Sequence, residues 1–138
     1  MLGRDSRFVL DNNLIISAIK SGWKRSTDLL FTLLLSDAAI FVNKELLFEY
    51  EKYINKILGL PHLFLLIQKR SVLIDPSTDA LCVCRPFFPE SEFADIVHAA
   101  TCLEAEAILI SNDAHFNEIK KSALVEVWNI SEAIRRIL

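Results

Sequence analysis

The chain has 138 residues, a net charge of −3 and 52% hydrophobic residues, which is enough for a substantial core and excludes a disordered chain. Charges interrupt every apolar run before the roughly 18–20 residues that a membrane-spanning helix needs. The acidic balance argues against tight, non-specific nucleic-acid binding through a broad basic surface, although metal ions in an acidic site can supply local positive charge. We expect one domain over residues 1–138.

The cysteines and the N-terminus predict a cytoplasmic protein. Cys82, Cys84 and Cys102 make an odd number, which is typical of a reducing, intracellular environment. No second Cys or His pair stands at zinc-binding spacing from Cys82 and Cys84, so we expect buried thiols. The first residues lack the long apolar core of a signal peptide, so no secretory leader is expected.

Apolar runs of strand length and helix length alternate over the first 74 residues. Residues 7–10 predict a strand that ends at Asp11, and helical spacing begins at Leu14, with Gly22 as a plausible stop. The next predicted elements are a helix over 27–36 capped by Ser26 or Thr27, a strand over 39–42, a helix over 44–58 capped by Asn43 that buries Ile57 among others, a helix over about 62–69, and a strand over 72–74. We expect His62, which follows Pro61, to lie in the connection before the helix over 62–69.

The second half of the chain begins with its least regular stretch. Prolines punctuate residues 75–91, and residues 81–84 predict a short strand or extended segment. The further predictions are a helix over 92–105 capped by Ser91, a strand over 107–110, a helix over 114–121, a strand over 124–128 and a helix over 131–138 capped by Ser131. Because the strands are continuous apolar runs that alternate with helices, we expect an α/β fold with a parallel sheet covered on both faces.

Two acids follow two of the predicted central strands. Asp11 ends the first strand, and Asp113 follows the strand 107–110 together with Ser111 and Asn112. The carboxyl ends of parallel strands lie on one edge of a sheet, so Asp11 and Asp113 can converge there. The alternative for Asp113 is an N-cap of the helix that follows it.

Two helices supply further acids. Glu49 lies just outside the buried arc of helix 44–58, where it can reach over the rim of the core, or it can be a surface companion of Glu45 and Tyr53. Asp95 lies in the first turn of helix 92–105, where it or Glu92 can simply complement the helix dipole.

Four carboxylates in one site would predict a metal-dependent reaction. They cannot all stay ionised in close contact without cations, and oxygen ligands suit Mg²⁺ or Mn²⁺ rather than zinc. Such a metal can contact a phosphate oxygen, activate a water and stabilise a leaving oxygen. If Asp11, Glu49, Asp95 and Asp113 meet, the implied chemistry is phosphodiester hydrolysis.

Four segments of the chain carry a recognisable pattern: residues 9–17 (VLDNNLIIS), 43–50 (NKELLFEY), 94–101 (ADIVHAAT) and 109–116 (LISNDAHF). In this order they resemble the motifs of PIN domains (the PilT N-terminal family). Singly each motif is weak, but together they span nearly the whole chain. Ser111 stands where the family usually has Thr, which keeps the hydroxyl, and residues 59–91 match no motif.

The resemblance implies a three-layer α/β/α sandwich with a central, mainly parallel sheet, and a Mg²⁺- or Mn²⁺-dependent ribonuclease. Many short prokaryotic members are toxins of toxin–antitoxin pairs, often homodimeric and inhibited by a small antitoxin. By position, Asn13 and Ser111, with the adjacent Asn112, would hold the metal-binding loops or contact phosphate. The implied metal ligands and catalytic residues are Asp11, Glu49, Asp95 and Asp113.

His98 and His115 accompany these acids in the sequence. His98 can be read as a general base, but we favour a core or supporting role, because a metal-activated water needs no such base. We expect His115 to be exposed.

Two other classes of protein compete with the ribonuclease. One is a PIN-type binding or interaction module with weak or no catalysis, against which the presence of all four acids counts. The other is a phospho-receiver domain, which needs an acid pair after its first strand, whereas here a single Asp is followed by two Asn. Helices 27–36 and 62–69 hold more Leu and Phe than one core face needs, so we expect a dimer or antitoxin interface there.

Overall fold

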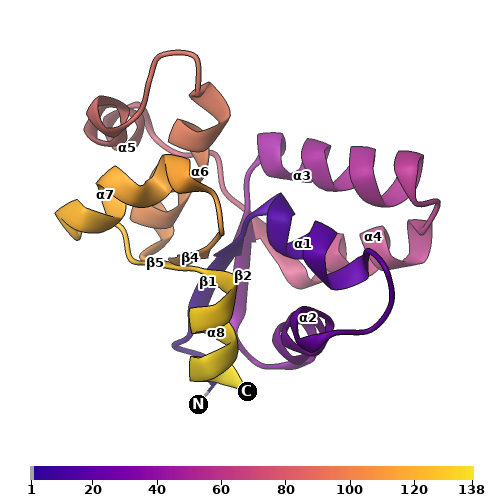
Figure 1. Ribbon diagram of the computed structural model, residues 1–138. Helices are drawn as coiled ribbons and strands as arrows, with labels where there is room; N and C mark the ends of the chain where they lie inside the picture. The colour runs from indigo at the N-terminus through magenta and orange to yellow at the C-terminus, as the bar shows by residue number, and fades with distance from the viewer. Residues whose placement is uncertain (1) are drawn as a thin grey trace.

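The computed structural model describes residues 2–138 and contains one five-stranded sheet in which all neighbouring strands are parallel. The strand order is β3-β2-β1-β4-β5, so β1 is central (Figure 1). Val9 of β1 aligns with Phe41 of β2 and Leu109 of β4. The predicted α/β fold is confirmed. The strands are β1 (Arg7–Leu10), β2 (Ala39–Val42), β3 (Ser71–Leu73), β4 (Ile108–Ile110) and β5 (Val127–Trp128).

Helices connect the strands and cover both faces of the sheet. Helix α6 packs on β1, β2 and β4, whereas α1 packs against α2 and α2 against α8. Figure 1 shows α5, α6 and α7 above and to the left of the strands and α1 to α4 to their right. The helices are α1 (Asn12–Ile19), α2 (Arg25–Leu35), α3 (Lys44–Tyr50), α4 (Pro61–Arg70), α5 (Thr78–Cys84), α6 (Phe93–Ala105), α7 (Asn117–Ser122) and α8 (Ile130–Ile137), with a π-helix η1 (Glu51–Ile57) and short 3₁₀ turns η2 (Arg85–Phe87) and η3 (Ala114–Phe116).

The central strand is buried on both faces, which explains its unbroken apolar run. Phe8, Val9 and Leu10 are all nearly inaccessible to solvent. The chain then turns into α1 because the Asp11 side chain accepts a hydrogen bond from the Asn12 amide at 2.8 Å. After α1, Gly22 has a φ of 91°, a conformation that glycine adopts without steric cost.

Residues 81–84 are helical, so the predicted strand or extended segment there is wrong. They belong to α5, whose N-cap Ser77 accepts from the Ala80 amide at 3.1 Å. Ala80 and Cys84, four residues apart, are the buried residues of this helix. A four-residue apolar run does not distinguish a strand from one buried side of a short helix.

The predicted single helix over 44–58 is also corrected. Its expected cap, Asn43, does accept from the Leu46 amide at 2.8 Å, but after Tyr50 the chain continues as the π-helix η1. The wider turns of a π-helix shift the direction of the side chains that follow. Ile57, which we expected to be buried, is 62% exposed.

Three other predicted helix caps are replaced by neighbouring residues. The cap residue of helix α2 is Lys24. Its backbone amide donates to Thr27 Oγ1 at 3.0 Å, so Thr27 is the third residue of the helix and not its cap. Asn129, not Ser131, caps α8 through the Glu132 amide at 2.7 Å. Glu92, not Ser91, holds the cap position of α6, without a side-chain hydrogen bond.

Smaller differences concern exposure and element length. Cys82 is exposed, so the expectation of buried thiols holds only for Cys84 and Cys102. His62 lies in the first turn of α4 and not in a connection. The predicted helix over 114–121 divides into η3 and α7, and the last strand contains only Val127–Trp128. Within residues 2–138, no helix is long and apolar enough to cross a membrane.

Candidate metal-binding active site

The carboxyl ends of β1 and β4 meet at a buried carboxylate. Asp11, directly after β1, is only 7% exposed. Its Oδ1 accepts from the Asn12 amide, and its Oδ2 accepts from the Ser111 hydroxyl at 2.6 Å. Because β1 and β4 are adjacent parallel strands, the residues after them lie side by side, and Ser111 is the first residue after β4.

Asn13 joins the two loops at this edge. Its Nδ2 lies 3.3 Å from Ser111 Oγ, and its Oδ1 accepts from the Asn112 amide at 3.3 Å. Asn112 uses its own Oδ1 to accept from the Ile130 amide at 2.8 Å, which ties the loop to the start of α8. Asn12 makes no comparable contact, since its buried Oδ1 has no hydrogen-bond partner. These amides therefore contact the loops that carry Asp11 and Asp113.

Asp113 and Asp95 meet through His115. The Asp113 carboxylate accepts from the His115 amide at 2.9 Å, as an N-cap does, and also lies 3.3 Å from His115 Nδ1. The same Nδ1 lies 2.8 Å from Asp95 Oδ2. Ser111 Oγ accepts from the Asp113 amide at 3.0 Å, so Asp113 also connects to Asp11.

The fourth acid, Glu49, comes from α3 and not from the loops that follow β1 and β4. The residue after it, Tyr50, is fully buried and donates its hydroxyl hydrogen to the carbonyl of Leu10, which attaches α3 to the end of β1. Glu49 Oε2 lies 2.9 Å from Nε2 of His98, a buried residue of α6. His98 is three residues after Asp95 on that helix, so Glu49 contacts α6 about one turn after Asp95.

The acidic side chains at this edge have two histidines beside them, His98 and His115, but, within the described part of the chain, no lysine or arginine. Among residues 2–138, no Lys or Arg nitrogen lies within 4.0 Å of Asp11, Glu49, Asp95 or Asp113. Buried carboxylates that lack a positive partner are costly in their ionised form. The arrangement therefore leaves uncompensated negative charge.

The pKa values of two acids reflect this environment. Burial raises the pKa of Asp11, and the nearby Glu49 carboxylate adds to the rise, whereas the hydrogen bond from Ser111 opposes it. Burial likewise raises the pKa of Asp95 to about 6, with a further contribution from the negative charge of Asp113. The hydrogen bond to Asp95 raises the pKa of His115.

The donor set fits a hard divalent cation. Carboxylate oxygens of Asp11, Glu49, Asp95 and Asp113 are the ligands that Mg²⁺ and Mn²⁺ prefer, and a cation would relieve the charge that burial leaves unpaired. The oxygens of these four acids do not form a ready cage: within residues 2–138, the one group of three metal-ligand atoms within 4.8 Å of one another is Glu92, Asp95 and His115.

The sequence did not predict that Glu92 and His115 would lie together beside Asp95. Glu92 was considered only as a helix-dipole partner, yet its Oε2 lies 3.6 Å from His115 Nδ1. The available signals were the spacing of three between Glu92 and Asp95, which places them on one face of a helix, and the position of His115 two residues after Asp113. His115 is exposed as expected, with 47% of its side chain accessible.

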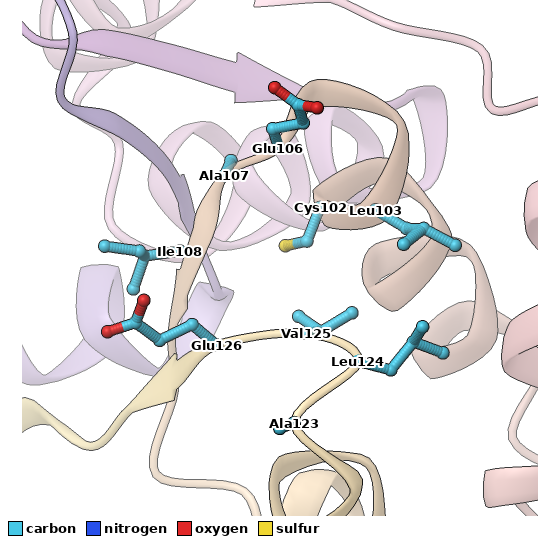
Figure 2. Close-up of a pocket in the computed structure, with 9 residues that line it drawn as sticks. All are labelled: Cys102, Leu103, Glu106, Ala107, Ile108, Ala123, Leu124, Val125 and Glu126. Carbon is cyan, nitrogen blue, oxygen red and sulfur yellow. The ribbon is translucent and has the colours of Figure 1, made fainter.

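A surface pocket lies at the opposite end of β4 (Figure 2). It is lined by residues from the end of α6 and the segment before β5, and its two carboxylates, Glu106 and Glu126, point in different directions. It contains no histidine and no pair of converging acids. The acids and histidines described above lie instead where the strands end, near the starts of α1 and α3 in Figure 1.

The five-stranded parallel sheet in the order β3-β2-β1-β4-β5, flanked by helices, is the fold of PIN domains. The solved structures that match include VapBC-1 from nontypeable Haemophilus influenzae, with a TM-score of 0.62 and 17% identity over 91% of this chain and 98% of that chain. VapBC2 from Rickettsia felis bound to a DNA fragment from their promoter matches with a TM-score of 0.61 and 17% identity, over 89% and 98% of the two chains.

A third structure, FitAB bound to an IR36 DNA fragment, matches with a TM-score of 0.57 and 19% identity, over 89% of this chain and 94% of that chain. No protein-family model matches the chain, and no curated protein matches it. At such low identities the likeness concerns the fold, so the role of each residue depends on the contacts within this chain.

Proposed function

We propose that the protein is a Mg²⁺- or Mn²⁺-dependent ribonuclease that hydrolyses RNA phosphodiester bonds at the edge carrying Asp11, Glu49, Asp95 and Asp113. The observation that supports this most directly is the set of contacts that holds these carboxylates, which we call the acid network: Ser111 and His115 link Asp11, Asp113 and Asp95, and His98, one turn after Asp95 on α6, contacts Glu49. Within residues 2–138, no Lys or Arg nitrogen lies within 4.0 Å of any of the four acids. A site that concentrates negative charge in this way suits a divalent cation, which when bound would supply positive charge for a phosphate group.

The chain's own residues would divide the work as follows. The four carboxylates would hold the cation, which when bound supplies charge neutralisation at the phosphate and activates water. Ser111 holds Asp11 by a hydrogen bond and accepts from the amide of Asp113, so it fixes two ligands at once. Asn13 would keep the two loops at a constant separation.

The test is RNA cleavage in the presence of Mn²⁺. Structured and unstructured RNAs are incubated with the wild type, with Asp11→Asn and with Asp37→Asn, an exposed acid outside the site that serves as the matched control. We expect cleavage by the wild type and Asp37→Asn and its loss in Asp11→Asn. Equal cleavage by all three proteins would refute the proposed site, and RNA binding without cleavage by any of them would favour the binding module.

We also propose that the ribonuclease is the toxin of a toxin–antitoxin pair and forms a homodimer in the cytoplasm. The matched VapBC and FitAB structures support the pairing, as does an apolar groove between α1, α2 and α4. There Trp23, 70% exposed, stacks on Phe31 at 5.6 Å beside Leu60 and Leu63. Exposed apolar surface of this kind is typical of a partner interface.

Two measurements address the partners. A short reading frame beside the gene, whose product co-purifies with the protein and inhibits cleavage, would establish the antitoxin. We expect Trp23→Ser to weaken that inhibition and leave cleavage unchanged, because Trp23 lies outside the acid network. A monomer at micromolar concentration in light scattering would refute the dimer.

A further inference from the structure

His98 is buried inside the protein yet touches one of the proposed metal ligands. It is 1% exposed and lies in the middle of α6. Its Nε2 is 2.9 Å from Glu49 Oε2, and its Nδ1 is 3.0 Å from Asn43 Nδ2. The direction of these two hydrogen bonds determines where the imidazole carries its proton.

The amide of Asn43 has only one possible orientation. Asn43 caps α3, and its Oδ1 accepts from the backbone amide of Leu46 at 2.8 Å. A backbone amide can only donate, so the atom that receives it must be the carbonyl oxygen of the side chain. The NH₂ group of Asn43 therefore faces the interior, where it meets His98 Nδ1 and Thr101 Oγ1, each at 3.0 Å.

Both hydrogens of this NH₂ group have an acceptor. The Thr101 hydroxyl donates its only hydrogen to the carbonyl of Val97 at 2.7 Å, so towards Asn43 it can only accept. The other hydrogen of Asn43 points to His98 Nδ1, which must accept it with a lone pair. A neutral imidazole that accepts at Nδ1 carries its proton on Nε2, and that proton faces Glu49.

We propose that His98 is a positioning residue. The Asn43 cap holds it as the neutral Nε2–H tautomer, and in this form it donates a hydrogen bond to Glu49. That bond directs the Glu49 carboxylate towards Asp11, Asp95 and Asp113 at the carboxyl end of the sheet, which we call the acid edge. The part that concerns the metal rests on the proposed function. In this state both ring nitrogens are occupied, so His98 has no lone pair with which to act as a general base. An uncharged ring also leaves the negative charge of Glu49 available to a divalent cation, whereas an imidazolium would compete with that cation.

The tautomer can be tested without any catalysis. In ¹⁵N-histidine-labelled protein at neutral pH, two-bond ¹H–¹⁵N correlation spectra distinguish a protonated from an unprotonated ring nitrogen. We expect His98 to show a protonated Nε2 and an unprotonated Nδ1. In Asn43→Asp, which keeps the cap acceptor and removes the NH₂ donor, we expect Nδ1 to gain a proton. A proton on Nδ1 in the wild type would overturn the assignment.

The positioning role is tested by Mn²⁺ affinity. His98→Gln keeps an N–H donor for Glu49, whereas His98→Leu removes it. Loss of a hydrogen bond that orients a metal ligand typically weakens metal binding by about 10–100-fold, so we expect calorimetry to show such a loss for His98→Leu and a smaller one for His98→Gln. Equal affinities of wild type and His98→Leu would overturn the role.

Two controls separate the outcomes. Urea denaturation establishes whether His98→Leu is folded under the conditions of calorimetry. If this variant is unfolded, the tautomer is still tested, because that measurement is made on the wild type. If the wild type binds no Mn²⁺, the metal-dependent function is refuted, and with it the positioning role, while the tautomer stands or fails on the spectra alone.

Discussion

The Ser111 hydroxyl donates to Asp11 Oδ2 at 2.6 Å, although the two residues are 100 positions apart in the sequence. The same oxygen accepts from the Asp113 amide at 3.0 Å and lies 3.3 Å from Asn13 Nδ2. A hydroxyl offers one donor and two acceptor sites, so these three contacts use its full capacity. One buried side chain thus joins the ends of two adjacent strands.

Removal of this hydroxyl should lower both stability and activity. Ser111→Ala leaves Asp11, a buried carboxylate, without one of its two hydrogen bonds, and such a loss costs about 1–3 kcal/mol in the free energy of unfolding. Ser111→Thr keeps the hydroxyl and is the matched control. Urea denaturation and RNA cleavage check the pair, and an alanine variant as stable and active as the threonine variant would contradict the assigned role.

The metal-free protein should become less stable as the pH rises through the acidic range. The pKa values of Asp11 and Asp95 are raised by burial, and that of His115 by its hydrogen bond to Asp95. A group with a raised pKa binds its proton more tightly in the folded state, so stability falls as the pH rises past its unfolded pKa. For Asp95 this window runs from 3.8 to about 6, and for His115 it begins at 6.5.

Asp95→Asn should flatten this profile, because it removes one shifted group and the hydrogen-bond partner that shifts the other. The measurement is the free energy of unfolding in urea, with EDTA present, at a series of pH values. Asp37→Asn, an exposed site, should follow the wild type. A profile of Asp95→Asn that is as steep as that of the wild type would show that these groups do not control the pH dependence.

The fold could be predicted from sequence because the physical signals were local and strong. Residues 8–10 are buried on both faces of the sheet, which requires an unbroken apolar run, and an acid directly after such a strand has to lie at the sheet edge. The apolar run at residues 81–84 led to a wrong prediction. These residues form a helix, which is capped by Ser77 and buries Ala80 and Cys84.

The details of the site were less accessible, because they depend on side chains from distant elements. Nothing in the residues around Glu49 indicates that its carboxylate meets His98 of α6, or that Asn43 lies behind that ring. The meeting of Glu92 and His115 likewise depends on how η3 packs against α6. Periodicity assigns residues to a face of a helix but does not determine which element covers that face.

The three thiols should differ sharply in reactivity. Cys82 is exposed, whereas Cys84 and Cys102 are buried. Burial raises the pKa of Cys84 to about 11, and burial also raises that of Cys102, so neither forms the reactive thiolate readily at neutral pH. We expect a disulfide reagent to modify Cys82 rapidly in the native protein and the other two only after denaturation, so rapid native modification of two or three thiols would contradict the packing around α5 and α6.

Arg70, at the end of α4, should be important for stability although it lies outside the acid network. Its guanidinium donates to four backbone carbonyls: Leu34 at 2.6 Å, Ala38 at 2.9 Å, Ser36 at 3.1 Å and Leu33 at 3.2 Å. The last carbonyls of a helix lack partners within it, so a positive group placed there both satisfies them and complements the helix dipole.

We therefore expect Arg70→Met to destabilise the protein by about 1.5–3 kcal/mol, the range for hydrogen bonds to charged groups. Methionine retains much of the apolar stem of arginine, so the loss measures the guanidinium contacts. The neighbouring Lys69→Met is the control, since Lys69 is exposed on the same helix and should cost little. Urea denaturation compares the two variants. An equal cost for both would mean that the four carbonyls find other partners, and loss of RNA cleavage in a folded Arg70→Met would mean that the end of α2 influences the acid edge.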